Sequence, residues 1–152
     1  MGKTVLFSGA ASSVACVLAL ACGSAWALAL VVIDLRRRLL PDALTLPGAA
    51  VAALVAVAAG EPWAMAGGVA RALLYLGVGL LIGGVGGGDV KLALALGTAA
   101  AIAAGAAGLA AAVIGSSALT ITVMALTRRR ALPHGPGMVS ATVLVCLVAQ
   151  VL

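Results

Sequence analysis

The chain has 152 residues, of which 64% are hydrophobic and only 9% are charged. A soluble domain is usually about half apolar and about one quarter charged, so this chain has too few polar residues to cover a globular surface. These proportions exclude an ordinary soluble fold. They predict a single all-α integral membrane domain that occupies residues 1–152, with little of the chain outside the bilayer.

The net charge of +5 does not indicate a nucleic-acid partner, because only 3% of the residues are aromatic and bases would find few side chains to stack on. Seven of the nine basic residues instead lie at the edges of apolar runs: Arg36, Arg37, Arg38, Lys91, Arg128, Arg129 and Arg130. Basic residues in that position mark cytoplasmic loops. We therefore expect these loops to face the cytoplasm.

The first predicted helix runs from about Thr4 to Asp34. Its N-terminal part resembles a signal peptide, because Lys3 precedes an apolar run that ends in the small residues of SAWA, Ser24–Ala27. The uncharged run would however be about 45 Å long as a helix, which is longer than a signal core. We expect a retained spanning helix, and a mature N-terminus at Leu28 would contradict this.

The next two helices are separated by turn residues. Pro41 opens the second helix, with Asp42 predicted as its N-cap, and this helix ends near Ala59. The tripeptide GEP, residues 60–62, is a tight turn. It leads into a third helix over residues 63–81.

A glycine-rich segment, Gly83–Gly88, comes before a long apolar run. We expect the fourth helix to begin at about Asp89. Residues 92–127 carry no charge and exceed the roughly 20 residues that one span needs. We therefore divide them near Gly105 and Gly108 into a fourth and a fifth helix, and the fifth ends before the arginines at Arg128.

The motif LPHGPG, residues 132–137, is predicted as a turn, and a sixth helix covers residues 138–152. Six spans put both chain ends on one side of the membrane and the arginine loops on the other. Small residues recur every fourth position in two series, which favours close helix contact. These residues are Gly97, Ala101 and Gly105 in one series and Gly108, Ala112 and Ser116 in the other.

Acidic residues are the strongest candidates for chemistry, because an ionisable group near the hydrocarbon is costly. Glu61 fits a solvated turn, and Asp42 fits a helix cap. Asp34 ends the first predicted helix and Asp89 begins the fourth, so both lie at one membrane depth and can face each other. Two close carboxylates share a proton, as in aspartic proteases. Each residue alone is equally explained as a helix end at the membrane interface.

The glycines before Asp89 allow close approach of the backbone and positive φ. A phosphate-binding loop is the competing interpretation. The sequence excludes a phosphate-binding loop, because no G-K-[ST] follows and the last glycine of a dinucleotide fingerprint is missing.

Three stretches together resemble the type IV prepilin peptidases. IDLRRRLLPDALTLPG, residues 33–48, is similar to the first signature of that family, and GGGDVKLALALG, residues 86–97, is similar to its second, the G-x-G-D motif. LPHGPG resembles the late proline-glycine-proline turn, with His134 where an aromatic residue is usual.

The resemblance implies a membrane aspartic endopeptidase that uses neither a cofactor nor a metal. By match of motif, Asp34 and Asp89 are the catalytic pair. Supporting motif residues would be Pro41, Asp42, Thr45, Gly86, Gly88 and Lys91. The implied substrates are prepilins or pseudopilins with a basic leader and an apolar helix, cut at the cytoplasmic face of the bacterial plasma membrane. The enzyme would then serve pilus biogenesis or protein secretion, with membrane lipids as its surroundings.

The chain also departs from longer members, because it has no paired C-x-x-C motifs. We therefore expect a short form without methyltransferase activity. Lys91 is expected to tune the pKa of Asp89 or to meet lipid phosphate, Arg71 to pair with an acid or to line a wet cavity, and His134 to be a turn residue. The alternative functions are a small transporter or assembly subunit that uses the buried acids as an ion path, and an inactive homologue.

Overall fold

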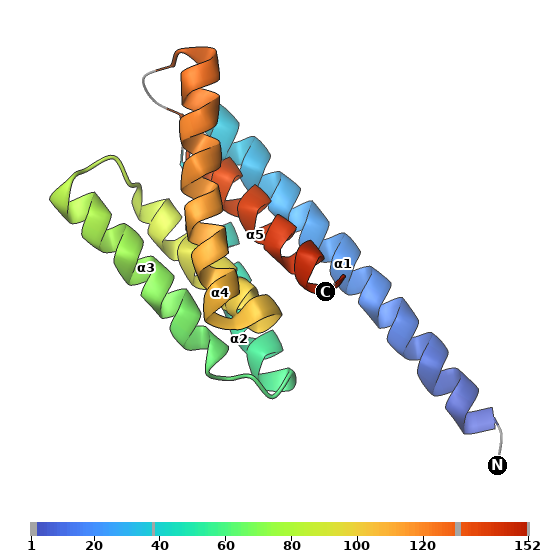
Figure 1. Cartoon of the computed structure of the whole chain (residues 1–152). Helices are drawn as coiled ribbons and strands as arrows, with labels where there is room; N and C mark the ends of the chain where they lie inside the picture. Colours follow the sequence, from blue (N-terminus) through green and yellow to red (C-terminus); the bar gives the residue numbers. More distant parts are fainter. Residues whose placement is uncertain (1–2, 38, 130–131, 152) are drawn as a thin grey trace.

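The computed structural model describes residues 3–37, 39–129 and 132–151. In this part the chain forms five helices and no strand: α1 (Lys3–Arg37), α2 (Asp42–Ala58), α3 (Ala64–Leu81), α4 (Gly87–Thr127) and α5 (Gly135–Ala149) (Figure 1). The prediction of an all-α fold is confirmed. The predicted loop residues Arg38 and Arg130 and the predicted helix end at Leu152 lie outside the described residues.

The six predicted spans are not found, because the described residues form five elements and residues 87–127 are continuous as α4. The predicted division near Gly105 is confirmed, however, because the backbone of α4 is non-helical at Ala104 (φ −150°, ψ 28°) and Gly105 (φ 58°, ψ −147°), which separates two helical arms. Glycine adopts positive φ without a steric cost, so the chain changes direction there without a polar loop. After the bend the second arm packs on the first, since a Cβ on Gly108 would lie 2.6 Å from the Ala100 carbonyl oxygen.

The surface of the bundle fits a lipid environment. Among the described residues, α3 and α4 are long and apolar enough to cross a membrane, while α2 and α5 are shorter apolar helices. Large apolar side chains point outward, and Leu80 and Ile82 are 78% and 82% exposed. Exposed apolar surface of this kind is unfavourable in water and favourable in hydrocarbon.

The helix ends that carry the sequence signatures gather at one end of the bundle. Figure 1 shows the C-terminal end of α1 near the start of α5, with the connection between α3 and α4 at the same end. The turn between α2 and α3 and the bend of α4 lie at the other end. The topology thus brings residues that are distant in sequence to one end, and its cytoplasmic orientation remains a prediction.

Close packing depends on small residues, as the sequence predicts. α4 packs against α2, α3 and α5, and α1 packs against α5. A Cβ on Gly97 of α4 would lie 2.8 Å from the Gly67 carbonyl oxygen of α3. The other predicted small residues that are buried are Ala101, Gly108, Ala112 and Ser116. Only Gly105 differs, because it forms the bend.

A tryptophan fixes α1 against α2. The Trp26 indole N–H donates to the Leu44 carbonyl oxygen at 3.0 Å, and Gly48 lies against the same ring with no room for a Cβ. Pro47 lies inside α2 and has no N–H to offer the preceding turn. The indole hydrogen bond therefore ties α2 to α1 near the turn in which Pro47 removes a backbone hydrogen bond.

The predicted turn at residues 132–137 is corrected at its end, because α5 already begins at Gly135. Pro136 lies in the first turn of α5. A proline costs little there, since the first N–H groups of a helix have no partner within it.

Candidate active site

The two predicted catalytic acids lie at the same end of the bundle. Asp34 is in the last turn of α1 and only 5% exposed, and Asp89 is in the first turn of α4 and partly buried. Both carboxyls lie outside the apolar segments, which end before Asp34 and begin at Leu92. Their position at helix ends puts them where a membrane-embedded bundle meets water.

The two carboxyls interact electrically. Burial raises the pKa of Asp34, and the negative charge of Asp89 raises this pKa further. Burial also raises the pKa of Asp89. A charge that raises the pKa of a neighbouring carboxyl makes it harder for both acids to be ionised at once. The arrangement can therefore offer a carboxylate and a carboxylic acid at the same pH.

Main-chain N–H groups hold one oxygen of each acid. Gly135 N donates to Asp34 Oδ2 at 3.0 Å, and Gly86 N donates to Asp89 Oδ2 at 3.3 Å. These bonds lower the pKa of each acid against the effect of burial. Among the described residues, the second oxygen of each carboxyl forms no hydrogen bond.

Leu40 brings the two signatures into contact. It is buried in the core cluster beneath the acids, and a Cβ on Gly88 would lie 2.7 Å from Leu40 Cβ. A Cβ on Gly135 would lie 3.5 Å from Leu40 Cδ1 and would clash with the Asp34 carboxyl. Leu40 is therefore packed between the starts of α4 and α5, and the absence of side chains at Gly88 and Gly135 allows this.

The remaining glycines of the segment have a different role. Gly83 and Gly84 have φ of 81° and 84°, in the left-handed region that other residues rarely adopt. They turn the chain between α3 and α4. Gly86, by contrast, has extended backbone (φ −77°, ψ 149°) that any residue can adopt.

Two supporting motif residues form an ion pair across the site. Lys91 Nζ lies 2.6 Å from Asp42 Oδ1 and 2.7 Å from Oδ2. The prediction that Asp42 caps the second helix is wrong, because Pro41 is at the cap position and no side-chain capping bond forms. Asp42 is exposed at the start of the helix, where it is free to meet Lys91 from α4. The pair thus links the first signature to the second.

Thr45, another supporting residue, is fully buried, and its hydroxyl donates to the Pro41 carbonyl oxygen at 3.4 Å. This contact lies within the first turn of α2. The hydrogen bond satisfies a buried hydroxyl next to the turn that carries Leu40, so Thr45 has a structural role.

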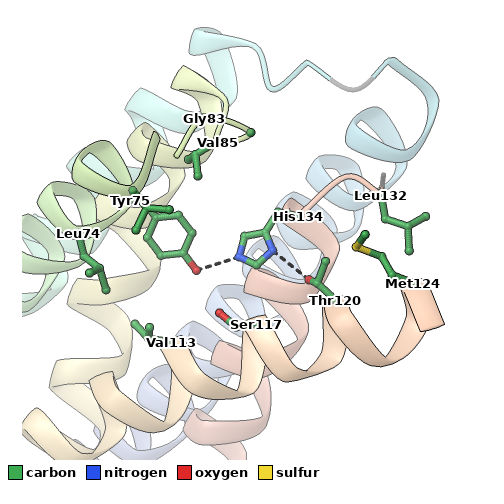
Figure 2. Close-up of a pocket in the computed structure, with 12 residues that line it drawn as sticks. Leu74, Tyr75, Gly83, Val85, Val113, Ser117, Thr120, Met124, Leu132 and His134 are labelled. Carbon is green, nitrogen blue, oxygen red and sulfur yellow. Dashed lines mark hydrogen bonds between the residues drawn. The ribbon is translucent and has the colours of Figure 1, made fainter. Parts of the chain in front are cut away.

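His134 is part of a polar network rather than a free turn residue. Its Nε2 lies 2.9 Å from the Tyr75 hydroxyl and its Nδ1 lies 2.9 Å from Thr120 Oγ1 (Figure 2). The same side chains line a cavity of about 430 Å³ that reaches Gly83. Burial lowers the pKa of His134, as does the charge of Arg71, while the charge of Asp34 opposes both.

The structure does not show Arg71 paired with an acid, and its other predicted role, lining a wet cavity, stays a prediction. Arg71 is 1% exposed, and its Nη1 donates to Thr142 Oγ1 at 2.9 Å rather than to an acid. Its guanidinium carbon lies 5.8 Å from the centre of the Tyr75 ring. Glu61 lies in the turn between α2 and α3 as predicted and accepts a hydrogen bond from the Trp63 indole.

Sequence reasoning missed the contributions of Leu40, Tyr75, Thr120 and Gly135. Gly135 and Leu40 carried a signal, because they belong to LPHGPG and to the first signature over residues 33–48, but those motifs did not indicate their contacts with Asp34 and Gly88. Tyr75 and Thr120 are ordinary residues in apolar runs, and only the tertiary structure shows their neighbours. Among the described residues, no three His, Cys, Asp or Glu side chains are grouped so as to hold a metal ion.

Comparison with known proteins agrees with the motifs. The sequence profile of the type IV leader peptidase family matches residues 20–127, a stretch that holds both acids and most of the bundle. No curated protein matches the chain, and no solved structure does so either.

Proposed function

Because the chain belongs to the type IV leader peptidase family, we propose that it is an aspartic endopeptidase with Asp34 and Asp89 as its catalytic pair. Its substrates would be type IV prepilins or pseudopilins, cut at the cytoplasmic face of the bacterial plasma membrane. The observation that carries this proposal is that two acids from two separate motifs lie at helix ends joined through Leu40, which packs against Gly88 beside Asp89 and lies near Gly135 beside Asp34.

The surroundings of the two acids assign them different tasks. Asp89 lies in the first turn of α4, where the helix dipole favours a negative charge. Asp34 lies in the last turn of α1 and is more deeply buried, and both conditions disfavour its charged form. When the pair holds one proton, Asp34 is therefore the acid and Asp89 the carboxylate.

The proposed reaction begins when the Asp89 carboxylate takes a proton from a water molecule. The water oxygen attacks the scissile carbonyl carbon, and Asp34 gives its proton to the carbonyl oxygen. The C–N bond then breaks, with the proton on Asp89 passing to the leaving nitrogen. A hydroxyl of the intermediate returns a proton to Asp34, so the pair ends with the one proton with which it began.

The position of the pair suits the proposed substrates. A prepilin carries a basic leader followed by an apolar helix, so its cleavage point is where the chain enters the membrane. Asp34 and Asp89 lie where the apolar segments of α1 and α4 end. An apolar substrate helix alongside the bundle would present its cleavage point at the same depth.

The proposal is tested by co-expressing the chain with a prepilin that has a basic leader, a glycine and an apolar helix. Asp34→Asn and Asp89→Asn should each abolish removal of the leader. Glu61→Gln is the matched control, because this carboxyl lies in the turn at the other end of the bundle, and Asp42→Asn should also retain cleavage. Full processing by both aspartate variants would refute the assignment, and proton-coupled uptake into liposomes without any cleavage would favour the transporter.

A further inference from the structure

The connection that leads into α5 has a histidine whose ring is held at both nitrogens. Thr120 donates its hydroxyl hydrogen to the Ser116 carbonyl oxygen at 2.9 Å, and its oxygen lies 2.9 Å from Nδ1 of His134. Nε2 of His134 lies 2.9 Å from the Tyr75 hydroxyl, which also lies 3.0 Å from Ser116 Oγ. The ring is thus fixed between α3 and the second arm of α4 (Figure 2).

The residue after this ring contacts a proposed catalytic acid. Gly135 N donates to Asp34 Oδ2 at 3.0 Å, and the contact is too close for any side chain at Gly135. Gly135 directly follows His134, so one short stretch of backbone carries both the ring and this N–H. Contacts at both ring nitrogens therefore restrain the backbone that places the Gly135 N–H on Asp34.

We propose that His134 is a positioning residue for Asp34. Its ring, anchored by Tyr75 and Thr120, keeps the Gly135 N–H on one carboxyl oxygen of Asp34. In this way it sets the pH above which the acid pair loses its last proton. The inference rests on the proposed function in taking Asp34 as the acid that holds this proton.

The charged groups around the site fix the sign of the effect. Asp34 faces Asp89 from α4 and His134 from the connection before α5. His134 in turn faces Arg71 and Tyr75 from α3 and Asp34 from α1. Asp89 raises the pKa of Asp34, whereas the Gly135 N–H and His134 lower it. Loss of the N–H therefore raises the pKa of Asp34, and the proton leaves at a higher pH.

The matched variants are His134→Asn, Thr120→Val and Tyr75→Phe. Each variant removes one or both of the hydrogen-bonded contacts of the ring. We expect a tenfold to hundredfold loss of kcat, which is the order that misplacement of a catalytic group causes, with KM changed by less than about twofold. The basic limb of the pH profile should move upward by up to about one pH unit, the order expected for one hydrogen bond to a carboxylate, while the acidic limb stays in place.

Thr127→Val is the control, because Thr127 makes the same kind of hydroxyl contact with the preceding turn of α4 but is exposed and outside the network. It should leave kcat and both limbs unchanged. If His134 only stabilised the fold, its variants would lower the midpoint of thermal unfolding and lose activity equally at every pH. A pH-independent loss in all three variants would overturn the proposal.

A readout without substrate separates this inference from the proposed function. The pKa of Asp34 can be followed by carbon-13 NMR of its labelled carboxyl in the purified, detergent-solubilised protein. A higher pKa in His134→Asn and Thr120→Val than in the parent supports the positioning role even if no prepilin is cleaved. An unchanged pKa in both variants refutes it even if the parent protein cleaves prepilins.

Discussion

Two glycines of the same motif should respond differently to the same substitution. Gly86 and Gly88 both belong to the G-x-G-D signature, so a motif alone predicts equal sensitivity. In the structure a Cβ on Gly88 would lie 2.7 Å from Leu40 Cβ and 3.2 Å from the Leu40 carbonyl oxygen. A Cβ on Gly86 would lie 3.6 Å from Asp89 Oδ2, which is an ordinary contact. We predict that Gly88→Ala impairs cleavage strongly and that Gly86→Ala does not.

The magnitude follows from the shift that the new methyl group forces. An ordinary contact begins at about 3.4 Å, so α4 and the turn at Leu40 must separate by about 0.7 Å. Overpacking of this kind costs about 1–3 kcal/mol, and about 1 kcal/mol is recovered because alanine favours a helix more than glycine does. The fold should survive, but Asp89 moves relative to Asp34, and a misplacement near 1 Å costs up to about 100-fold in rate. Gly86→Ala loses only a favoured cap residue, at about 1 kcal/mol.

The assay is the initial rate of leader removal from a purified prepilin in liposomes, with thermal unfolding of each variant measured in parallel. Gly88→Ala should lose about 10-fold to 100-fold in rate while its unfolding midpoint falls by only a few degrees. Equal rates for the two variants, whether both high or both low, would show that contact with Leu40 does not position Asp89.

Three further results are expected. The side chains of Lys91 and Asp42 are 39% and 59% exposed, respectively. Asp42→Lys should therefore lower the free energy of unfolding by only about 0.2–1 kcal/mol, and the double variant with Lys91→Asp should restore it. Both proposed catalytic acids have a pKa raised above 3.8 in the folded protein, so their contribution to stability is fully present below that pH and is lost as the pH rises through the raised values. The unfolding midpoint should fall over this range, and Asp34→Asn should make this fall less steep. Gly135→Ala should abolish cleavage, because the new methyl group would displace the Asp34 carboxyl, and an active Gly135→Ala enzyme would contradict the contact.

The sequence was sufficient for the helical class and for most helix boundaries. Charges and turn residues mark where a chain leaves the membrane, so α2 and α3 begin and end within two residues of their predicted limits. The break within residues 92–127 could be predicted from length, because this uncharged run exceeds the roughly 20 residues that one span needs. Its form could not be predicted, because Gly105 adopts positive φ within an apolar run, where a glycine is equally compatible with straight helix.

Within the candidate site, the sequence predicted only the positions of the charged residues. Asp34 and Asp89 stand out because acids are rare in this chain, and their shared membrane depth follows from topology. The role of Asp42 was misjudged, because a cap requires only local sequence whereas its partner Lys91 comes from another helix. Leu40 belongs to the first signature, but its packing against Gly88 could not be predicted, because the contact joins two segments that are distant in sequence.

The glycine-rich segment before Asp89 combines three separate physical requirements. Positive φ at Gly83 and Gly84 reverses the chain after α3, the Gly86 N–H holds an oxygen of Asp89, and the bare Gly88 lets α4 approach Leu40. Only the positive φ at Gly83 and Gly84 and the close contact at Gly88 require glycine. The segment is therefore better described as a fixed support than as a flexible joint, because each of its contacts restrains where the Asp89 carboxyl lies. Since Leu40 follows α1, which carries Asp34, the same packing contact that holds α4 also sets the separation of the two acids.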